Sequence, residues 1–278
     1  VKYRSMERVN TLNSGNDALN WQSNQGWRET GRNSGGNQIY GSPKRSNFGS
    51  IVLNFNQEDT VRTLTAINNP YILQYYSIPA GKTLLVEPGV VIKSNFNNSN
   101  IDVFGTLTAS GTLANKIVFT SGRDVLLENT NGTAIIGSWP SPTSTAQDWQ
   151  GVWFKPGSVG TLQGVDFRYA GKPFIVPPSA LPISQAIRVD GGQLTISDSN
   201  FYNNGPIVLF IKSSTTTISR ASFDSGDRAI ESEKSILSIS DSSFSNFTSS
   251  ISPLYIKDKW PLLEKNLYLN NVVNMPYL

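Results

Sequence analysis

Four charged residues at one position of a repeat are the first candidates for chemistry. Asp198, Arg220, Asp241 and Lys265 each stand three residues before an aromatic residue, in ISDSNF, ISRASF, ISDSSF and LEKNLY. Two carboxylates can form the acid–base pair of a glycosidase, and an arginine between them can serve as the base or the electrostatic clamp of a polysaccharide lyase. On strands spaced by about 4.8 Å, the two Asp residues would lie about 9.6 Å apart, at the upper limit for an inverting pair.

A structural role explains the same four charges more completely. Their signs alternate from one repeat to the next, and opposite charges on adjacent strands contribute roughly 0.2–1 kcal/mol while like charges are destabilising. This interpretation also accounts for Lys265, which the catalytic one does not need. We therefore predict a structural charge ladder.

The composition removes several kinds of chemistry. The chain has no His and no Cys, so catalytic triads, disulfides and the usual zinc sites are excluded, and any catalysis falls to carboxylates, Lys, Arg or Tyr. The net charge is only +3, and no Lys- and Arg-rich run is interleaved with aromatics, so nucleic acid is not an expected partner. The sequence contains no apolar run of about 18 residues, so insertion into a membrane is not expected.

The repeat that carries these charges also predicts the architecture. The aromatic residues Phe201, Phe223, Phe244 and Tyr268 follow one another at steps of 22, 21 and 24 residues. A unit of this length, with short alternating runs such as QLTIS and TTTIS, cannot bury its own apolar face and must stack on its neighbours. We expect an all-β solenoid, a parallel β-helix of about seven coils over residues 76–278, with insertions at 125–148 and 170–184.

Small polar residues follow the aromatic column. Asn203, Ser225, Asn246 and Asn270 each stand two residues after an aromatic position. We expect these side chains to stack between coils and to satisfy the backbone of the bends, and a role as metal ligands is the less favoured alternative.

Longer stretches of the chain resemble a known family of folds. LLVEPGVVIKSN, IDVFGTLTASGTLANKIVFTS and DWQGVWFKPGSVGTLQGVDFRYAG are similar to the coils of right-handed parallel β-helix domains in large bacterial cell-surface and secreted proteins, which share the pectate-lyase-like superfold. The resemblance implies a right-handed helix. It does not imply an activity, because enzymes, adhesins and stalks share this coil.

The N-terminal region resembles a different module. SMERVNTLNSGNDALNWQSNQGWRETG and the following NQIYGSPKRSN are similar to the C-terminal part of a lamin tail domain, a β-sandwich. Only its last strands are present, so a partner or missing residues would have to complete it. We accordingly assign 1–47 to this remnant and 48–75 to a linker with a capping strand, since the end of a solenoid must be covered.

Tryptophan residues are the candidates for ligand binding. Strand alternation predicts that Trp149 and Trp153 point outward near Trp139, where they could form a platform for sugar rings. The apolar insertion at 170–184 could instead cover them, which we favour. The loop around Asn129 and Asn131 is a weak candidate for calcium, because Asp124 and Glu128 are its only nearby carboxylates. No other cofactor or metal is expected.

These observations favour a non-catalytic extracellular or cell-surface module that serves as a stalk, an adhesive face or an envelope component. Its partners would be glycans or neighbouring surface proteins. One alternative is a polysaccharide lyase or glycoside hydrolase, which would require Asp166, Asp190 and either Arg188 or Arg168 to meet in one groove. Another is a self-associating filament or surface-layer subunit.

Overall fold

The computed structural model describes most of the chain after residue 58 and short pieces before it. The described ranges are 59–66, 69–94, 99–124, 144–175, 182–247, 253–257 and 267–272, together with short segments between residues 3 and 40. Tyr3–Arg4 (β1), Glu29–Arg32 (β4) and Gln38–Tyr40 (β5) form a three-stranded sheet, and Met6–Arg8 (β2) pairs with Trp21–Ser23 (β3). The relation of residues 1–47 to a lamin tail domain stays a prediction.

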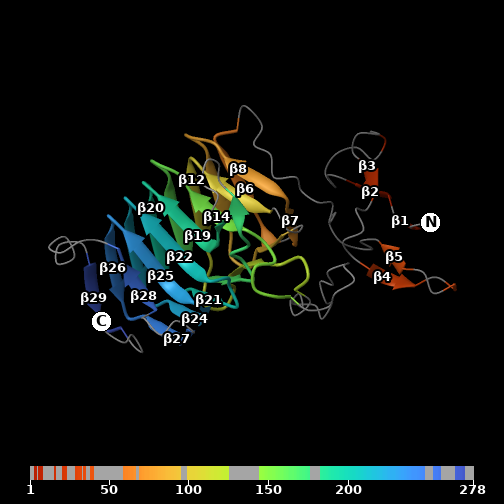
Figure 1. Ribbon diagram of the computed structural model, residues 1–278. Helices are drawn as coiled ribbons and strands as arrows, with labels where there is room; N and C mark the ends of the chain where they lie inside the picture. Colours follow the sequence, from red (N-terminus) through yellow and green to blue (C-terminus); the bar gives the residue numbers. More distant parts are fainter. Residues whose placement is uncertain are drawn as a thin grey trace.

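The rest of the chain winds through three parallel sheets, which Figure 1 shows as a stack of coils running from orange to blue. Sheet 1 consists of β7 (Tyr71–Leu73), β10 (Val91–Ser94), β13 (Ile117–Thr120), β16 (Val165–Arg168), β21 (Asn200–Tyr202), β24 (Ser222–Gly226) and β27 (Ser243–Phe247). Sheet 2 consists of β8 (Tyr75–Ile78), β11 (Asn100–Val103), β14 (Gly151–Phe154), β19 (Gln185–Asp190), β22 (Ile207–Lys212), β25 (Arg228–Glu233) and β28 (Leu254–Ile256). Sheet 3 consists of β6 (Val61–Leu64), β9 (Thr83–Val86), β12 (Thr106–Ser110), β15 (Val159–Gln163), β20 (Gln193–Ser197), β23 (Thr215–Ser219), β26 (Ile236–Ser240) and β29 (Leu267–Asn270).

Each coil takes one strand from each sheet in the order 1, 2, 3, and each strand pairs with its equivalents in the neighbouring coils. The predicted right-handed parallel β-helix is therefore confirmed. Its strands begin at Val61, inside the segment that we expected to be a linker and capping strand. Phe174–Ile175 (β17) and Pro182–Ile183 (β18) pair antiparallel within the predicted insertion at 170–184. In the described ranges, no helix has the length and apolar character needed to cross a membrane.

The core consists of columns of like residues that run from coil to coil. In sheet 3, alternate residues such as Leu194 and Ile196 point inward, and Ile196 pairs with Ile218 of the next coil. In sheet 1, the rings of Phe201 and Phe223 stack with centroids 4.8 Å apart, and those of Phe223 and Phe244 stack at 5.2 Å. This spacing is close to that of the strands, so the coil repeat itself brings the rings into contact.

Tyr268 does not continue this column, contrary to the prediction. It lies in β29 of sheet 3, where it pairs with Ser238, and its side chain is 55% exposed. The aligned residues lie in sheet 1 instead. The cause is an extra stretch of chain, because β29 follows β28 after residues 257–266, whereas β26 follows β25 after only Lys234 and Ser235. Counting residues from Phe244 therefore reaches a different sheet.

The bends between strands depend on residues with positive φ. Asp198, Arg220, Asp241 and Asn271 occupy equivalent bends after strands of sheet 3, with φ of 54°, 49°, 48° and 49°. Asn271, rather than the predicted Lys265, is thus the fourth member of this ladder; Lys265 lies outside the described residues. Asp and Asn tolerate this conformation better than most residue types do.

The predicted Asn ladder is placed correctly in part. Asn203 directly follows β21, and Ser225 and Asn246 are the penultimate residues of β24 and β27; all three have positive φ, of 54°, 65° and 55°, whereas Asn270 ends β29 of sheet 3. The Asn246 amide joins two coils, because its Nδ2 donates to Asp224 Oδ1 at 2.6 Å, and two other coils are joined by the buried amide of Asn204. Its Oδ1 accepts from the Ala170 backbone at 3.0 Å, and its Nδ2 donates to the Phe167 carbonyl at 2.9 Å.

The aromatic column predicts a large local contribution to stability. Phe223 is 0% exposed and stacks on both neighbouring rings, so Phe223→Ala should lower the free energy of unfolding by about 3–5 kcal/mol. Urea unfolding followed by circular dichroism measures this change. Tyr268→Ala is the control and should change stability by less than about 0.5 kcal/mol. A loss below about 1 kcal/mol in Phe223→Ala would contradict the packing described above.

Candidate functional site

Two groups of polar side chains lie on the outer faces of the coils. One is a buried ionic network at the root of the predicted insertion at 125–148, on sheet 1, which we term the insertion network. The other covers the outer face of sheet 2, which we term the sheet 2 face. Both could perform chemistry or bind a ligand, and we describe each in turn.

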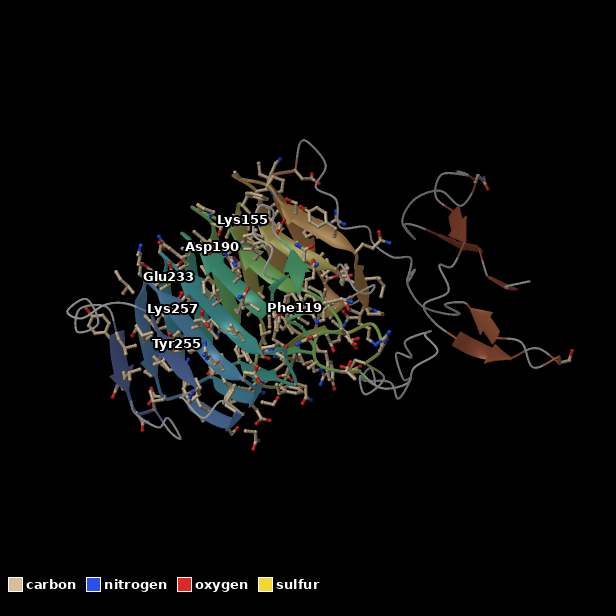
Figure 2. All side chains as sticks on the ribbon, viewed as in Figure 1. Phe119, Lys155, Asp190, Glu233, Tyr255 and Lys257 are labelled. Carbon is tan, nitrogen blue, oxygen red and sulfur yellow. The ribbon has the colours of Figure 1, made fainter. Side chains whose placement is uncertain are left out.

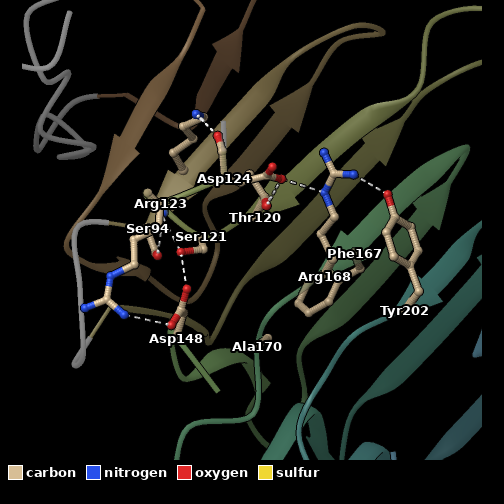
Figure 3. Close-up of polar contacts among 12 residues, drawn as sticks. Ser94, Thr120, Ser121, Arg123, Asp124, Asp148, Phe167, Arg168, Ala170 and Tyr202 are labelled. Atoms are coloured by element: carbon tan, nitrogen blue, oxygen red, sulfur yellow. Dashed lines mark hydrogen bonds and ion pairs between the residues drawn. The ribbon is translucent and has the colours of Figure 1, made fainter. Parts of the chain in front are cut away.

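The insertion network centres on the carboxylate of Asp124, just after β13 (Figure 3). Its Oδ2 atom lies 2.8 Å from Arg168 Nε and accepts a hydrogen bond from the Thr120 hydroxyl at 2.6 Å. Lys93, only 2% exposed, donates to the Asp124 backbone carbonyl at 2.6 Å. Arg168 Nη1 donates in turn to the hydroxyl of Tyr202. Four strands of sheet 1 thus contribute to one cluster.

The other end of the insertion is held beside the same cluster. Asp148 accepts a hydrogen bond from the Ser121 hydroxyl at 2.6 Å and pairs with Arg123 at 3.2 Å (Figure 3). It also accepts from the backbone and the hydroxyl of Thr145. Ser94, Ser121, Arg123 and Asp148 border a small open depression. Both ends of the inserted segment are therefore anchored by carboxylates of the chain itself.

The electrostatics of the network limit its chemistry. Burial lowers the pKa of Lys93 to about 8, although the nearby Asp124 opposes this shift. Burial raises the pKa of Tyr202, so the phenol stays protonated at neutral pH despite the Arg168 guanidinium beside it. Because Arg168 pairs with the Asp124 carboxylate and Lys93 lies beside it, Asp124 is a poor calcium ligand. The other residues considered for calcium, Glu128, Asn129 and Asn131, lie outside the described ranges.

The sheet 2 face carries two rows of side chains that stand two residues apart. The first row contains paired residues of successive strands, namely Asp102, Trp153, Arg188, Phe210, Glu231 and Tyr255. The second row contains Lys155, Asp190, Lys212, Glu233 and Lys257, whose charges alternate in sign. Figure 2 shows Lys155, Asp190, Glu233 and Lys257 in succession along this side of the stack.

Trp153 lies at the centre of one charge cluster on this face. The Lys155 Nζ atom is 2.9 Å from the centroid of its ring, and the Arg188 guanidinium is 4.9 Å from it. The indole Nε1 donates to Asp190 Oδ2 at 2.8 Å, and the same oxygen lies 2.6 Å from Arg188 Nε. Lys155 also pairs with Asp102 at 3.1 Å. Trp153 points outward as predicted, but the two cations occupy the place where a sugar ring would stack.

A second cluster repeats this pattern farther along the face. Glu231 pairs with Arg228 at 2.9 Å and with Lys257, and Arg228 lies 4.4 Å from the centroid of Tyr255. Lys212 pairs with Glu233 at 3.1 Å. The charges of the sheet 2 face are thus neutralised by one another, mostly between neighbouring coils. Sequence reasoning missed this lattice, although the alternating signs in the second row were visible once the register was known.

The charges that first suggested an active site form a structural pair instead. Arg220 Nε and Nη2 donate to the two oxygens of Asp198 at 2.7 and 2.8 Å, which confirms the predicted contact between neighbouring coils. These hydrogen bonds lower the pKa of Asp198. Asp241 accepts a hydrogen bond from Asn271 at 2.7 Å.

The groove required by the enzymatic alternative is not formed by the residues named for it. Asp166 lies on sheet 1, where it pairs with Lys116 at 3.1 Å, whereas Asp190 lies on sheet 2 with Arg188. Arg168 belongs to the insertion network. In the part of the chain that the structure describes, no three carboxylate, Cys or His side chains come close enough to hold a metal ion.

The prediction for Trp149 was wrong. Its side chain is 1% exposed and packs inside the helix against Phe167, with ring centroids 5.2 Å apart, and its indole donates to the Arg168 carbonyl. Trp149 precedes β14, and Gly151 has a φ of 119°, so strand alternation does not extend back to it. An exposed platform therefore does not describe it. Trp139 lies outside the described residues.

Comparison of the chain with models of protein families, with curated proteins and with solved structures found no match. The fold assignment therefore depends on the strand pairing described above.

The buried Lys93 predicts a distinct dependence of stability on pH. The folded protein releases the Lys93 proton at about pH 8, and the unfolded chain near pH 10.5, so between these values the unfolded chain binds more protons. The free energy of unfolding of the wild type, relative to Lys93→Met, should therefore rise by about 3 kcal/mol from pH 8 to pH 10.5 and stay constant below pH 8. Urea titrations at a series of pH values measure the difference. If the difference in free energy of unfolding between the wild type and Lys93→Met does not change with pH, Lys93 is not buried.

The Asp198–Arg220 pair predicts only a small effect. Arg220 is 58% exposed and solvent screens the pair, so Asp198→Asn should lower the free energy of unfolding by less than about 1 kcal/mol, the more so because Asn accepts positive φ well. Thermal unfolding at low and high salt measures the effect, which salt should reduce further. Loss of a measured activity without loss of folding would mean that Asp198 has a functional role.

Proposed function

We propose that the chain is a non-catalytic binding and display module. The observation that carries this proposal is the mutual neutralisation of charges on the sheet 2 face. Asp190 holds Arg188 and the Trp153 indole together, and Lys155 lies between Asp102 and the ring of Trp153. Groups that are paired in this way are held in fixed positions by one another, which suits a surface for display more than a free acid–base pair.

The insertion network also supports a structural role over a catalytic one. Its lysine has a lowered pKa, which is a property of many catalytic bases. However, the Lys93 side chain is covered and its amine donates to the Asp124 carbonyl, while the raised pKa of Tyr202 argues against a tyrosinate base. A buried ionic cluster at the root of an insertion is better explained as an anchor for that insertion.

The partners that suit such a module are glycans or neighbouring proteins at a cell surface. The proposed location is extracellular or on the cell surface, in line with the resemblance to bacterial surface domains. Three parallel sheets around a continuous core make a stiff support. The sheet 2 face then presents fixed aromatic and charged side chains over the length of seven strands.

The proposal predicts that the protein does not turn over polysaccharides. Incubation with polygalacturonate, alginate and neutral glucans should produce neither unsaturated nor new reducing ends, which absorbance and reducing-sugar assays measure. Turnover by the wild type that disappears in Arg168→Lys or Lys93→Met, while both variants remain folded, would overturn the proposal in favour of a lyase or hydrolase at the insertion network.

A further inference from the structure

A third row of the sheet 2 face stands two residues before the first row and is interrupted at Gly151. Tyr75, Asn100 and Gly151 are paired neighbours on β8, β11 and β14, and the third of them has no side chain. A Cβ atom at Gly151 would lie 1.9 Å from the Ala186 carbonyl oxygen, and its φ is 119°. The close approach of β19 therefore requires glycine here and leaves a gap in the row of side chains.

A shallow, open depression lies at this gap. Side chains of Asn100, Gln150, Trp153, Gln185 and Arg188 border it. The Gln185 Oε1 atom is buried and accepts no hydrogen bond from the described part of the chain. A buried amide oxygen without a donor costs about 1–3 kcal/mol, so a ligand that supplies a donor to Gln185 would offset that cost.

An exposed aromatic ring lies in the same row. Tyr75 is 62% exposed, and its hydroxyl donates to Asp102 Oδ2 at 3.1 Å, which fixes one end of the ring. It stands two strands from Gly151, a separation of about 9.6 Å. A fixed ring and an amide-lined depression in line with it suit an extended ligand that has both apolar C–H faces and hydroxyl groups.

The charges beside the depression favour an uncharged ligand. Asp102, Lys155, Arg188 and Asp190 sum to zero, and ion pairs join Lys155 to Asp102 and Arg188 to Asp190. An acidic polymer would have to break an existing ion pair to find a cation. The amides of Asn100, Gln150 and Gln185 can both donate to and accept from hydroxyl groups, so they match a sugar without needing a net charge.

We infer that Tyr75 and the depression at Gly151 form a binding site for a neutral, hydroxyl-rich saccharide chain. The chain lies across β8, β11 and β14, with one sugar ring against Tyr75 and a later one hydrogen-bonded by Asn100 and Gln185. No sugar ring stacks on Trp153, because Lys155 and Arg188 lie against its ring. This inference rests on the proposed binding function and names its ligand class.

Binding of neutral oligosaccharides to the full chain tests the inference. An array of glucan, xylan, mannan and galactan hexasaccharides, followed by calorimetry with the best ligand, should show binding that persists at high salt. Tyr75→Ala and Gln185→Ala should each weaken binding at least tenfold, whereas Tyr75→Phe keeps the ring and should retain affinity within about threefold. Tyr268→Ala is the matched control, because it removes an exposed tyrosine from sheet 3, and it should bind like the wild type.

Several outcomes would overturn the inference. These are no binding to any neutral hexasaccharide at millimolar concentration, unchanged affinity in folded Tyr75→Ala and Gln185→Ala proteins, and binding of oligogalacturonates alone that disappears with salt. Capture of a protein through this face, without saccharide binding, would also reject the ligand class. None of these results implies turnover, so the proposed non-catalytic function would survive them. Hydrolysis of a bound hexasaccharide would reject that function separately.

Discussion

The structure depends on the in-register pairing of each strand of the three parallel sheets with the equivalent strand of the next coil. Because of this pairing, most side chains have as their nearest neighbour a residue about one coil away and not one close in sequence. Inside, it produces columns of like residues, such as the stacked rings of Phe201 and Phe223. At the corners the backbone leaves the ladder, and buried hydroxyl groups satisfy it; Ser199, for example, accepts from the Val165 backbone at 3.0 Å. A solenoid of this kind needs no element beyond the coil itself to hold its fold.

The same pairing constrains the outer surface. A charge on one coil faces a side chain of the next at about 4.8 Å, so two like charges would repel and opposite ones attract. The contacts of Asp198 with Arg220 and of Lys212 with Glu233 follow this rule on different faces. Its consequence on sheet 2 is a surface of paired charges and covered rings, which suits binding by shape and hydrogen bonds more than catalysis by a free acid or base.

The parts of the fold that repeat could be predicted from the sequence, and the parts that break the repeat could not. The columns through Phe201, Phe223 and Phe244, and the contact of Asp198 with Arg220, follow from spacing because their coils have nearly equal lengths. Tyr268 was misplaced because the preceding coil is longer. The environment of Trp153 was beyond prediction because Arg188 reaches it from β19, across an insertion whose length hides the register. The insertion at 125–148 was predicted, but the contact of Asp124 with Arg168 was not, because the spacing does not give the register of the strands on either side of that insertion.

Several irregular features of the helix lie in one coil. The connection from β13 to β14 contains the insertion and the buried Trp149, and β14 begins at Gly151, which has a positive φ. Anchoring the insertion there places Lys93, Asp124 and Arg168 out of solvent, and the desolvation of buried charges offsets most of what their pairing contributes. Uniform coils with apolar columns would give the rod its stiffness at lower energetic cost. An ionic anchor that adds little stability, close to a gap in a row of side chains, is in line with the proposal that this coil presents a surface to a partner.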